Sequence, residues 1–281
     1  MGGPTTTIDA DWLDLCRRAT ESLQLMLDQA PSVAERAVET GTRGEGGDHT
    51  LVIDESAEDI VFARLQRLHD DGLRFTAVSE ERGEVDFGGG GVTVVVDPID
   101  GSLNAKRRLS PYAVSIAVAD GPTMADVRFG YVYDFGAGEE WRAVSGEGAF
   151  LDDKPLDPSL GERRARDGRL ELLAIESADP RWLVGTVAEL AGRAHRLRAL
   201  GALAPALCQV AAARFDALLS LRNCRAVDVA AAQLIVREAG GHVSFPAFDE
   251  PLGAPLDVVP HSPVVAARSA DTLADLAGIG R

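Results

Sequence analysis

Lysine is almost absent from this chain of 281 residues, in which Lys106 and Lys154 are the only lysines among 28 basic residues and 44 acidic ones. The formal net charge is −16, and the isoelectric point is near 4.7. This balance argues against a basic surface for nucleic acid and against attraction to an anionic membrane. An anionic substrate would also be repelled unless bound metal ions reversed the local field. Scarce lysine beside abundant arginine fits either a GC-rich genome or adaptation to high salt, and composition does not decide between them.

Cysteine and histidine are also sparse. The three cysteines, Cys16, Cys208 and Cys224, form no Cys-x-x-Cys pair and are odd in number. They therefore exclude a disulfide framework and a zinc site, and we expect buried thiols. The five histidines are scattered without metal-ligand spacing.

The chain lacks an apolar run of the ~20 residues that a membrane-spanning helix needs. Its first residues, Met1-Gly2-Gly3-Pro4, lack a basic and apolar leader. We therefore expect a cytoplasmic protein. With 46% hydrophobic residues, the chain can bury one large core or two connected ones.

The most informative feature is Asp97-Pro98-Ile99-Asp100-Gly101-Ser102, which follows the apolar run at residues 92–96. The run predicts a buried strand, and the proline and glycine predict a sharp turn at its end. The turn gathers two carboxylates, the Ile99 carbonyl and a hydroxyl. Mg²⁺ prefers such oxygen ligands. The alternative is a solvated Asp-Gly turn.

Further acidic residues recur at the ends of predicted elements. Glu80 and Glu81 follow a short strand at 75–78, Asp54 begins an amphipathic helix, and Asp228 opens an apolar helix that Gly240-Gly241 stops. Taken singly, Asp54 and Asp228 could be helix N-caps and the glutamates a solvated loop. Their common order argues for one shared site.

This ordered set resembles the inositol monophosphatase superfamily, whose pattern runs Asp, Glu-Glu, Asp-Pro-Ile/Leu-Asp-Gly-Ser/Thr, Trp-Asp and Gly-Gly. The likeness extends through Ser110 to Ala117 and the hairpin Gly146 to Leu151, from about Asp48 to the C-terminus. Val227 replaces the usual Trp. The motif Arg225-Ala226-Val227-Asp228 is similar to that of the archaeal-type branch with dual fructose-1,6-bisphosphatase and inositol-1-monophosphatase activity.

The resemblance implies a site of two or three Mg²⁺ ions. Glu80, Asp97 and the Ile99 carbonyl would hold one ion, and Asp97, Asp100 and Asp228 a second. Asp54, Ser102 and Glu80 would be catalytic, with Asp54 and Ser102 orienting or deprotonating the attacking water and no covalent intermediate. The implied substrate-binding residues are Gly101, Ser102, Asn104, Arg198, Gly201 and Arg225. The Gly-rich residues 41–49 would fold over the site and add Asp48 to a further ion, or else form a surface loop.

Alternating strands and helices predict an α/β layered protein. The resemblance implies a five-layer αβαβα sandwich with the site between two halves. We predict an α+β half at 1–155 with most metal ligands, and an α/β half at 156–281 with Asp228 and the substrate-binding arginines. Residues 88–91 are expected to form a flexible connector and residues 156–169 a linker.

The resemblance implies a Mg²⁺-dependent phosphomonoesterase for small sugar or polyol phosphates, foremost fructose 1,6-bisphosphate and inositol 1-phosphate. The alternatives are a histidinol-phosphate or 3′-phosphoadenosine nucleotide phosphatase of the same superfamily, and a non-catalytic phosphosugar or cation sensor. A homodimer is also implied, without nucleic-acid or membrane partners.

Overall fold

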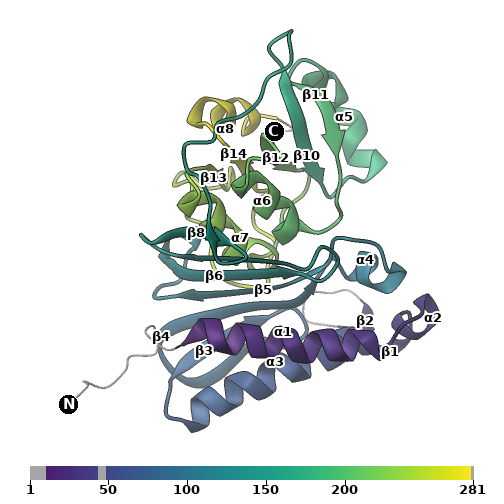
Figure 1. Cartoon of the computed structure of the whole chain (residues 1–281), viewed down its shortest axis with the longest axis vertical. Coiled ribbons are helices and arrows are strands. Elements are labelled where there is room, and N and C mark those ends of the chain that lie inside the picture. Colours follow the sequence, from purple (N-terminus) through teal and green to yellow (C-terminus); the bar gives the residue numbers. More distant parts are fainter. Residues whose placement is uncertain (1–10, 44–48, 280–281) are drawn as a thin grey trace.

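A computed structural model describes residues 11–43 and 49–279. Two large sheets and the helices around them stack in the order helix, sheet, helix, sheet, helix (Figure 1). This confirms the predicted five-layer α/β sandwich.

The larger sheet has seven strands in chain order. Strand β3 pairs parallel with residues 93–96 of β4, and all neighbouring pairs from β4–β5 to β8–β9 are antiparallel. They are β3 (Phe75–Ser79), β4 (Gly83–Asp100), β5 (Ala113–Ala119), β6 (Val127–Asp134), β7 (Glu139–Val144), β8 (Gly148–Leu151) and β9 (Lys154–Pro155). Residues 83–87 of β4 pair with one side of β3 and residues 93–96 with its other side. The four glycines at 88–91, expected to be a flexible connector, therefore lie within β4 as the turn between its two arms, and all have positive φ.

The smaller sheet has the strand order β11-β10-β12-β14-β13. Strand β10 pairs parallel with both neighbours, whereas the β12–β14 and β13–β14 pairs are antiparallel. The strands are β10 (Leu170–Glu176), β11 (Ala194–Arg198), β12 (Ala217–Ser220), β13 (His242–Ser244) and β14 (Val265–Ala267). A separate pair, β1 (Glu39–Arg43) and β2 (His49–Leu51), precedes both sheets in the chain.

Within the described residues, six helices form the three helical layers. They are α1 (Trp12–Asp28) and α3 (Val52–Asp70) beneath the larger sheet, α6 (Leu203–Ala211) and α7 (Ala226–Glu238) between the sheets, and α5 (Pro180–Ala191) and α8 (Ala270–Leu276) on the smaller sheet. Short helices α2 (Val33–Arg36), α4 (Ser102–Arg107) and η2 (Met124–Asp126) lie in connections. Asp11 caps α1 by accepting from Asp14 N at 3.0 Å.

Helix α7 is buried almost all round because it lies between two sheets. Its small residues allow a close approach to β6, where a Cβ on Gly130 would lie 2.6 Å from the Ala231 carbonyl oxygen. The rigid contact fixes the start of α7, where Asp228 lies.

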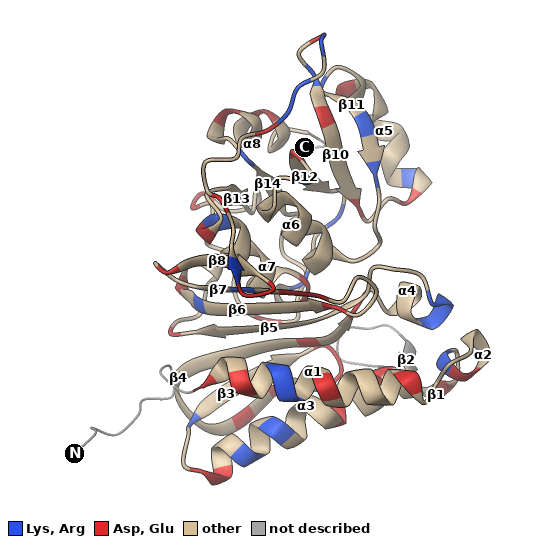
Figure 2. Cartoon of the chain, in the orientation of Figure 1, with Lys and Arg blue, Asp and Glu red and all other residues tan. Residues whose placement is uncertain are grey.

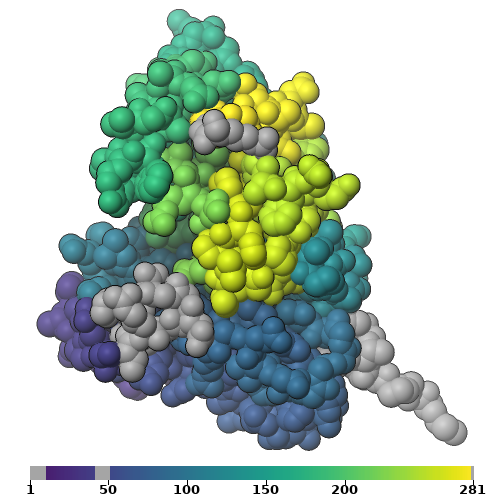
Figure 3. Space-filling view, turned by 180° about the vertical axis from the view of Figure 1, so that it is seen from behind, coloured from purple at the N-terminus to yellow at the C-terminus, as the bar shows by residue number. Residues whose placement is uncertain are grey.

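Residues 156–169 cross from the larger to the smaller sheet and are held along the way. The Arg268 Nε donates to Leu160 O at 2.8 Å, and Arg163 N donates to Asp216 Oδ1 at 2.7 Å. The hydrophobic core around α6 and α7 takes residues from both sheets, such as Val132 and Leu218. Seen from behind, the green and yellow C-terminal segments lie directly on the blue part of the chain (Figure 3). The division at residue 155 stays a prediction.

Cys16, Cys208 and Cys224 are buried and free, as expected. Acidic and basic residues are interspersed along α1 and α3 (Figure 2), as in the pair of Arg18 and Asp14 at 2.7 Å. No helix in residues 11–43 and 49–279 is long and apolar enough to cross a membrane.

Candidate active site

The turn at the C-terminal end of β4 has the sharp geometry that its sequence predicts. Asp97 Oδ1 accepts a hydrogen bond from Ile99 N at 2.9 Å. Gly101 has φ 88° and precedes α4; a Cβ there would lie 2.9 Å from the Cβ of Ala202. Glycine is therefore required at this position by both conformation and space. Ser102 Oγ donates to Ile99 O at 3.1 Å, and this carbonyl keeps a second lone pair for another partner.

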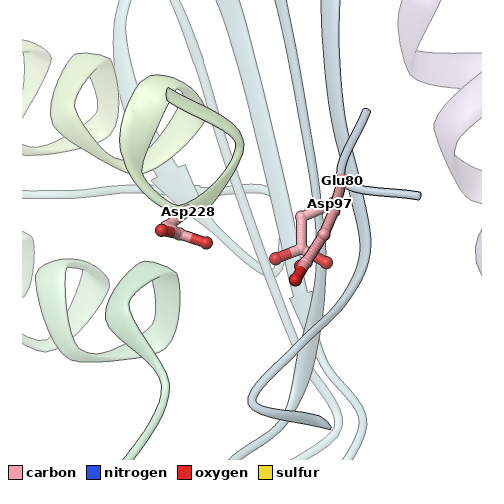
Figure 4. Close-up of side chains that lie close together, drawn as sticks. All are labelled: Glu80, Asp97 and Asp228. Atoms are coloured by element: carbon pink, nitrogen blue, oxygen red, sulfur yellow. The ribbon is translucent and has the colours of Figure 1, made fainter. Parts of the chain in front are cut away.

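Three acids from distant parts of the chain meet beside this turn. Glu80 follows β3, Asp97 lies in β4, and Asp228 lies in the first turn of α7. One carboxylate oxygen from each lies within 4.8 Å of the others, and Figure 4 shows the three side chains converging. Asp97 and Asp228 are buried, and Glu80 is half-buried. Buried carboxylates in such proximity favour a bound cation.

Asp100 is placed differently from the other predicted ligands. Its Oδ2 accepts from Ala204 N at 2.6 Å and its Oδ1 from Leu203 N at 3.3 Å, both in the first turn of α6. The side chain lines the same cavity as the three acids. Asp100 therefore anchors α6 to the turn and still has lone pairs available.

Arg225 lies among the predicted metal ligands. Its guanidinium donates to Glu80 Oε1 at 2.5 Å and to Asp228 Oδ1 at 3.2 Å. Arg198, the other predicted substrate-binding arginine, is exposed at the end of β11 and donates to Leu197 O at 2.8 Å. The structure thus brings Arg225 into the cavity and leaves Arg198 outside it.

Burial dominates the electrostatics of the cluster. It raises the pKa of Glu80 to about 7, an effect that the Arg225 charge opposes. Burial also raises the pKa of Asp97 and of Asp100 well above the usual range, and repulsion from neighbouring carboxylates adds to it. For Arg225, burial lowers the pKa, but the charges of Asp228 and Glu80 raise it more. Because burial and repulsion destabilise the ionised carboxylates, bound cations would stabilise them.

Asp54 and Ser102 face the same cavity from α3 and α4. Asp54 lies in the first turn of α3, where its Oδ2 accepts from Leu51 N at 3.3 Å. Burial raises the pKa of Asp54 to about 7, while the Ser102 hydroxyl and the Lys106 charge lower it. A carboxylate with a pKa near neutrality is suited to act as a general base.

The cavity has a volume of about 390 Å³. Asn104 lies outside its lining, because its Nδ2 donates to Pro111 O at 2.8 Å and to Leu200 O at 2.7 Å. The other predicted residues that line it are Asp54, Glu80, Asp97, Ile99, Asp100, Gly101, Ser102, Gly201, Arg225 and Asp228. Asp48, expected for a further ion, lies outside the described residues.

Sequence reasoning missed several lining residues, namely Glu39, Leu51, Leu103 and Lys106, and gave Glu81 no role beyond its motif. Lys106 could have been found, since it is one of only two lysines and lies one helical turn after Ser102. The place of Glu39 in the cavity lining depends on its pairing with Leu51 between β1 and β2, and no local sequence pattern predicts that pairing.

The chain is similar to known proteins over most of its length. A family model described as the inositol monophosphatase family matches residues 12–277. A fructose-1,6-bisphosphatase/inositol-1-monophosphatase of Methanothermobacter thermautotrophicus is 33% identical over 249 residues, covering 83% of this chain and 84% of that protein. The Nus factor SuhB of Escherichia coli is 32% identical over 212 residues, covering 74% of this chain and 75% of that protein.

Solved structures support the fold. The crystal structure of an inositol monophosphatase-fructose 1,6-bisphosphatase superimposes with a TM-score of 0.80 at 23% identity, covering 95% of this chain and 99% of that chain. The extragenic suppressor protein SuhB of Bartonella henselae gives a TM-score of 0.76 at 24% identity, covering 95% and 97%.

Proposed function

The chain belongs to the inositol monophosphatase family, and from this premise we propose that it is a magnesium-dependent phosphomonoesterase for small sugar or polyol phosphates. The observation that carries the proposal is the convergence of Glu80, Asp97 and Asp228 within 4.8 Å beside the Asp54–Ser102 pair. Every donor in this set is an oxygen, which fits a hard divalent cation.

In this proposal Glu80, Asp97 and the Ile99 carbonyl hold one cation, and Asp97, Asp100 and Asp228 hold a second. When bound, such ions neutralise phosphate oxygens and lower the pKa of a bound water. Arg225 is hydrogen-bonded to Glu80 and Asp228, so cations held by the same carboxylate oxygens would displace it. The released guanidinium would then be available to a phosphate.

Asp54 and Ser102 handle the proton of the attacking water. The Ser102 hydroxyl orients the water, and Asp54, with its pKa of about 7, accepts the proton near neutral pH. Gly101 and Ser102 also line the cavity, and their backbone N–H groups would bind the phosphate oxygens. The positive charge of Lys106, which lines the cavity beside the acidic residues and Arg225, would attract the dianion into the site.

The proposed substrates are fructose 1,6-bisphosphate and inositol 1-phosphate. The relative from Methanothermobacter thermautotrophicus bears both activities in its name, and a cavity of about 390 Å³ suits a small ligand. A distal phosphate needs a positively charged partner of its own. We assign this role to Arg225, which lines the cavity, and to Arg198, which lies outside the cavity lining.

A panel of phosphate esters tests this proposal. Phosphate release would be measured with Mg²⁺ from fructose 1,6-bisphosphate, inositol 1-phosphate, histidinol phosphate and 3′-phosphoadenosine nucleotide. We expect the first two to be hydrolysed with the highest kcat/KM. A preference for either of the last two would reassign the substrate, and no hydrolysis of any ester would favour a sensor.

We also propose that the protein is a homodimer, acts in the cytoplasm and binds neither nucleic acid nor membranes. Sedimentation equilibrium over a range of protein concentrations tests the dimer, and a monomer throughout would reject it.

A further inference from the structure

Two buried carboxylates hold the segment at residues 199–204 from its two ends. Asp100 accepts from the amides of Leu203 and Ala204 at the start of α6. Glu176, the last residue of β10, accepts from Leu200 N and Gly201 N, each at 2.8 Å. Four of the segment's backbone N–H groups are thus bound by two carboxylates.

This segment forms part of the wall of the candidate active site. Gly201 lines the cavity, with φ 78°, and a Cβ on it would lie 3.2 Å from the Asn104 Nδ2. The Leu200 carbonyl accepts from Asn104 in α4, the helix that begins at Ser102. A displacement of Leu200 or Gly201 would therefore reach both the cavity wall and α4.

Glu176 itself does not line the cavity, and only 1% of its surface is exposed. Two parallel N–H donors need two acceptor oxygens, which a carboxylate supplies. A glutamine would keep one acceptor and turn an N–H₂ group toward the second amide, leaving a buried donor unsatisfied. The residue type therefore matches the task of holding two adjacent amides.

We propose that Glu176 is a positioning residue for binding of the phosphate ester, because it sets Gly201 in the cavity wall. The inference rests on the proposed phosphatase function. It concerns substrate binding more than the chemical step, since Glu176 touches neither the acidic cluster of Glu80, Asp97 and Asp228 nor the Asp54–Ser102 pair.

The chain offers a matched control in Asp216. This carboxylate is also buried, with 2% exposed, and it also accepts from two backbone amides, Arg163 N and Leu172 N, each at 2.7 Å. It lies outside the cavity lining. A purely structural role for Glu176 predicts that Glu176→Gln and Asp216→Asn behave alike.

The test measures kcat and KM for inositol 1-phosphate at saturating Mg²⁺, together with thermal unfolding, in the wild type and both variants. We expect both variants to lose stability. Only Glu176→Gln should raise KM, by about tenfold, with kcat changed less than about twofold. Amide hydrogen exchange at Leu200 and Gly201 should quicken in Glu176→Gln alone.

An unchanged KM in folded Glu176→Gln, or an equal rise in Asp216→Asn, would overturn the positioning role. If Glu176→Gln does not fold, Glu176→Asp keeps the charge and shortens the side chain by one methylene, and its KM should lie above that of the wild type. A wild type that hydrolyses the ester while these variants leave KM unchanged would reject the positioning role alone. A wild type that hydrolyses no ester would reject the proposed function as well.

Discussion

The ion pairs that Arg225 forms restrict the role it can have in substrate binding. Its guanidinium is bound to Glu80 and Asp228, so it supplies positive charge where the proposed cations bind. A role in holding the distal phosphate of a bisphosphate requires release from both acids. Arg198, exposed at the end of β11, has no such constraint.

We expect Arg225→Ala to lower kcat/KM for fructose 1,6-bisphosphate about tenfold more than for inositol 1-phosphate, since charge-assisted hydrogen bonds to the distal phosphate are lost. Steady-state kinetics at fixed Mg²⁺ and ionic strength measure the difference. Arg198→Ala is the second variant. It should show the same preferential loss if Arg198 also holds the distal phosphate, and an unchanged ratio of the two substrates if its exposed place outside the cavity lining keeps it from the substrate. Equal proportional losses on the two substrates in Arg225→Ala would reject its distal-phosphate role.

At the residue scale, the sequence predicted the acids better than their surroundings. Asp97, Asp100 and Asp228 could be found because they belong to an ordered set of motifs beside apolar runs. The ion pair of Arg225 with Glu80 joins residues 145 positions apart, and no local pattern reveals such a contact. The two roles of Asp100, toward α6 and toward the cavity, were invisible for the same reason.

At the scale of elements, the site depends on where β4, α4 and α7 begin and end. The Pro-Ile-Asp-Gly turn follows from local chemistry, so it was predictable. The pairing of β3 with both arms of β4 was not predictable. It depends on a chain reversal at residues 88–91, and the sequence of these residues indicates only a glycine-rich connector. The close contact of α7 with Gly130 of β6 likewise appears only in three dimensions.

Gly101→Ala tests the turn between β4 and α4. We expect a loss of stability above the ~1–2 kcal/mol that left-handed backbone costs an ordinary residue, because the new Cβ would also lie 2.9 Å from the Cβ of Ala202. Activity should fall with it. Thermal unfolding and phosphate release provide the measurements.

Gly72→Ala serves as the comparison. Gly72 also has a positive φ, of 103°, yet a Cβ there meets nothing within 4 Å. This variant should show the backbone cost alone, with normal activity. If Gly101→Ala matched Gly72→Ala in both measurements, close packing at the turn would be irrelevant to the site.

At the scale of the whole molecule, buried acids make stability depend on pH. Burial raises the pKa of Asp54, Glu58, Glu80 and Glu176 to about 7 each. Their folded-state pKa values exceed the unfolded ones, so the folded protein binds protons more tightly. The resulting stability is complete below the unfolded pKa values and is lost as pH rises through about 7.

We therefore expect the metal-free protein to melt several degrees higher at pH 5 than at pH 8. Scanning calorimetry in EDTA measures this. A melting temperature that rose toward pH 8 would contradict the assignment of these pKa shifts.

Divalent cations should stabilise the whole protein specifically, because they bind the folded cluster and not the unfolded chain. At a hundredfold excess over the dissociation constant, Mg²⁺ should add about 2.7 kcal/mol to the free energy of unfolding. Chemical denaturation with Mg²⁺ and with NaCl of equal ionic strength separates specific binding from screening of the net charge of −16. Equal stabilisation by the two salts would indicate screening.

The central claim is that the acidic cluster is a metal-dependent phosphatase centre. The most direct measurement is phosphate release from inositol 1-phosphate and fructose 1,6-bisphosphate by the wild type and Asp97→Asn, with Mg²⁺ and with EDTA. We predict turnover only in the wild type with Mg²⁺, while Asp97→Asn stays folded because losing one charge relieves repulsion in the cluster. Near-normal turnover by Asp97→Asn, or by the wild type in EDTA, would contradict the account.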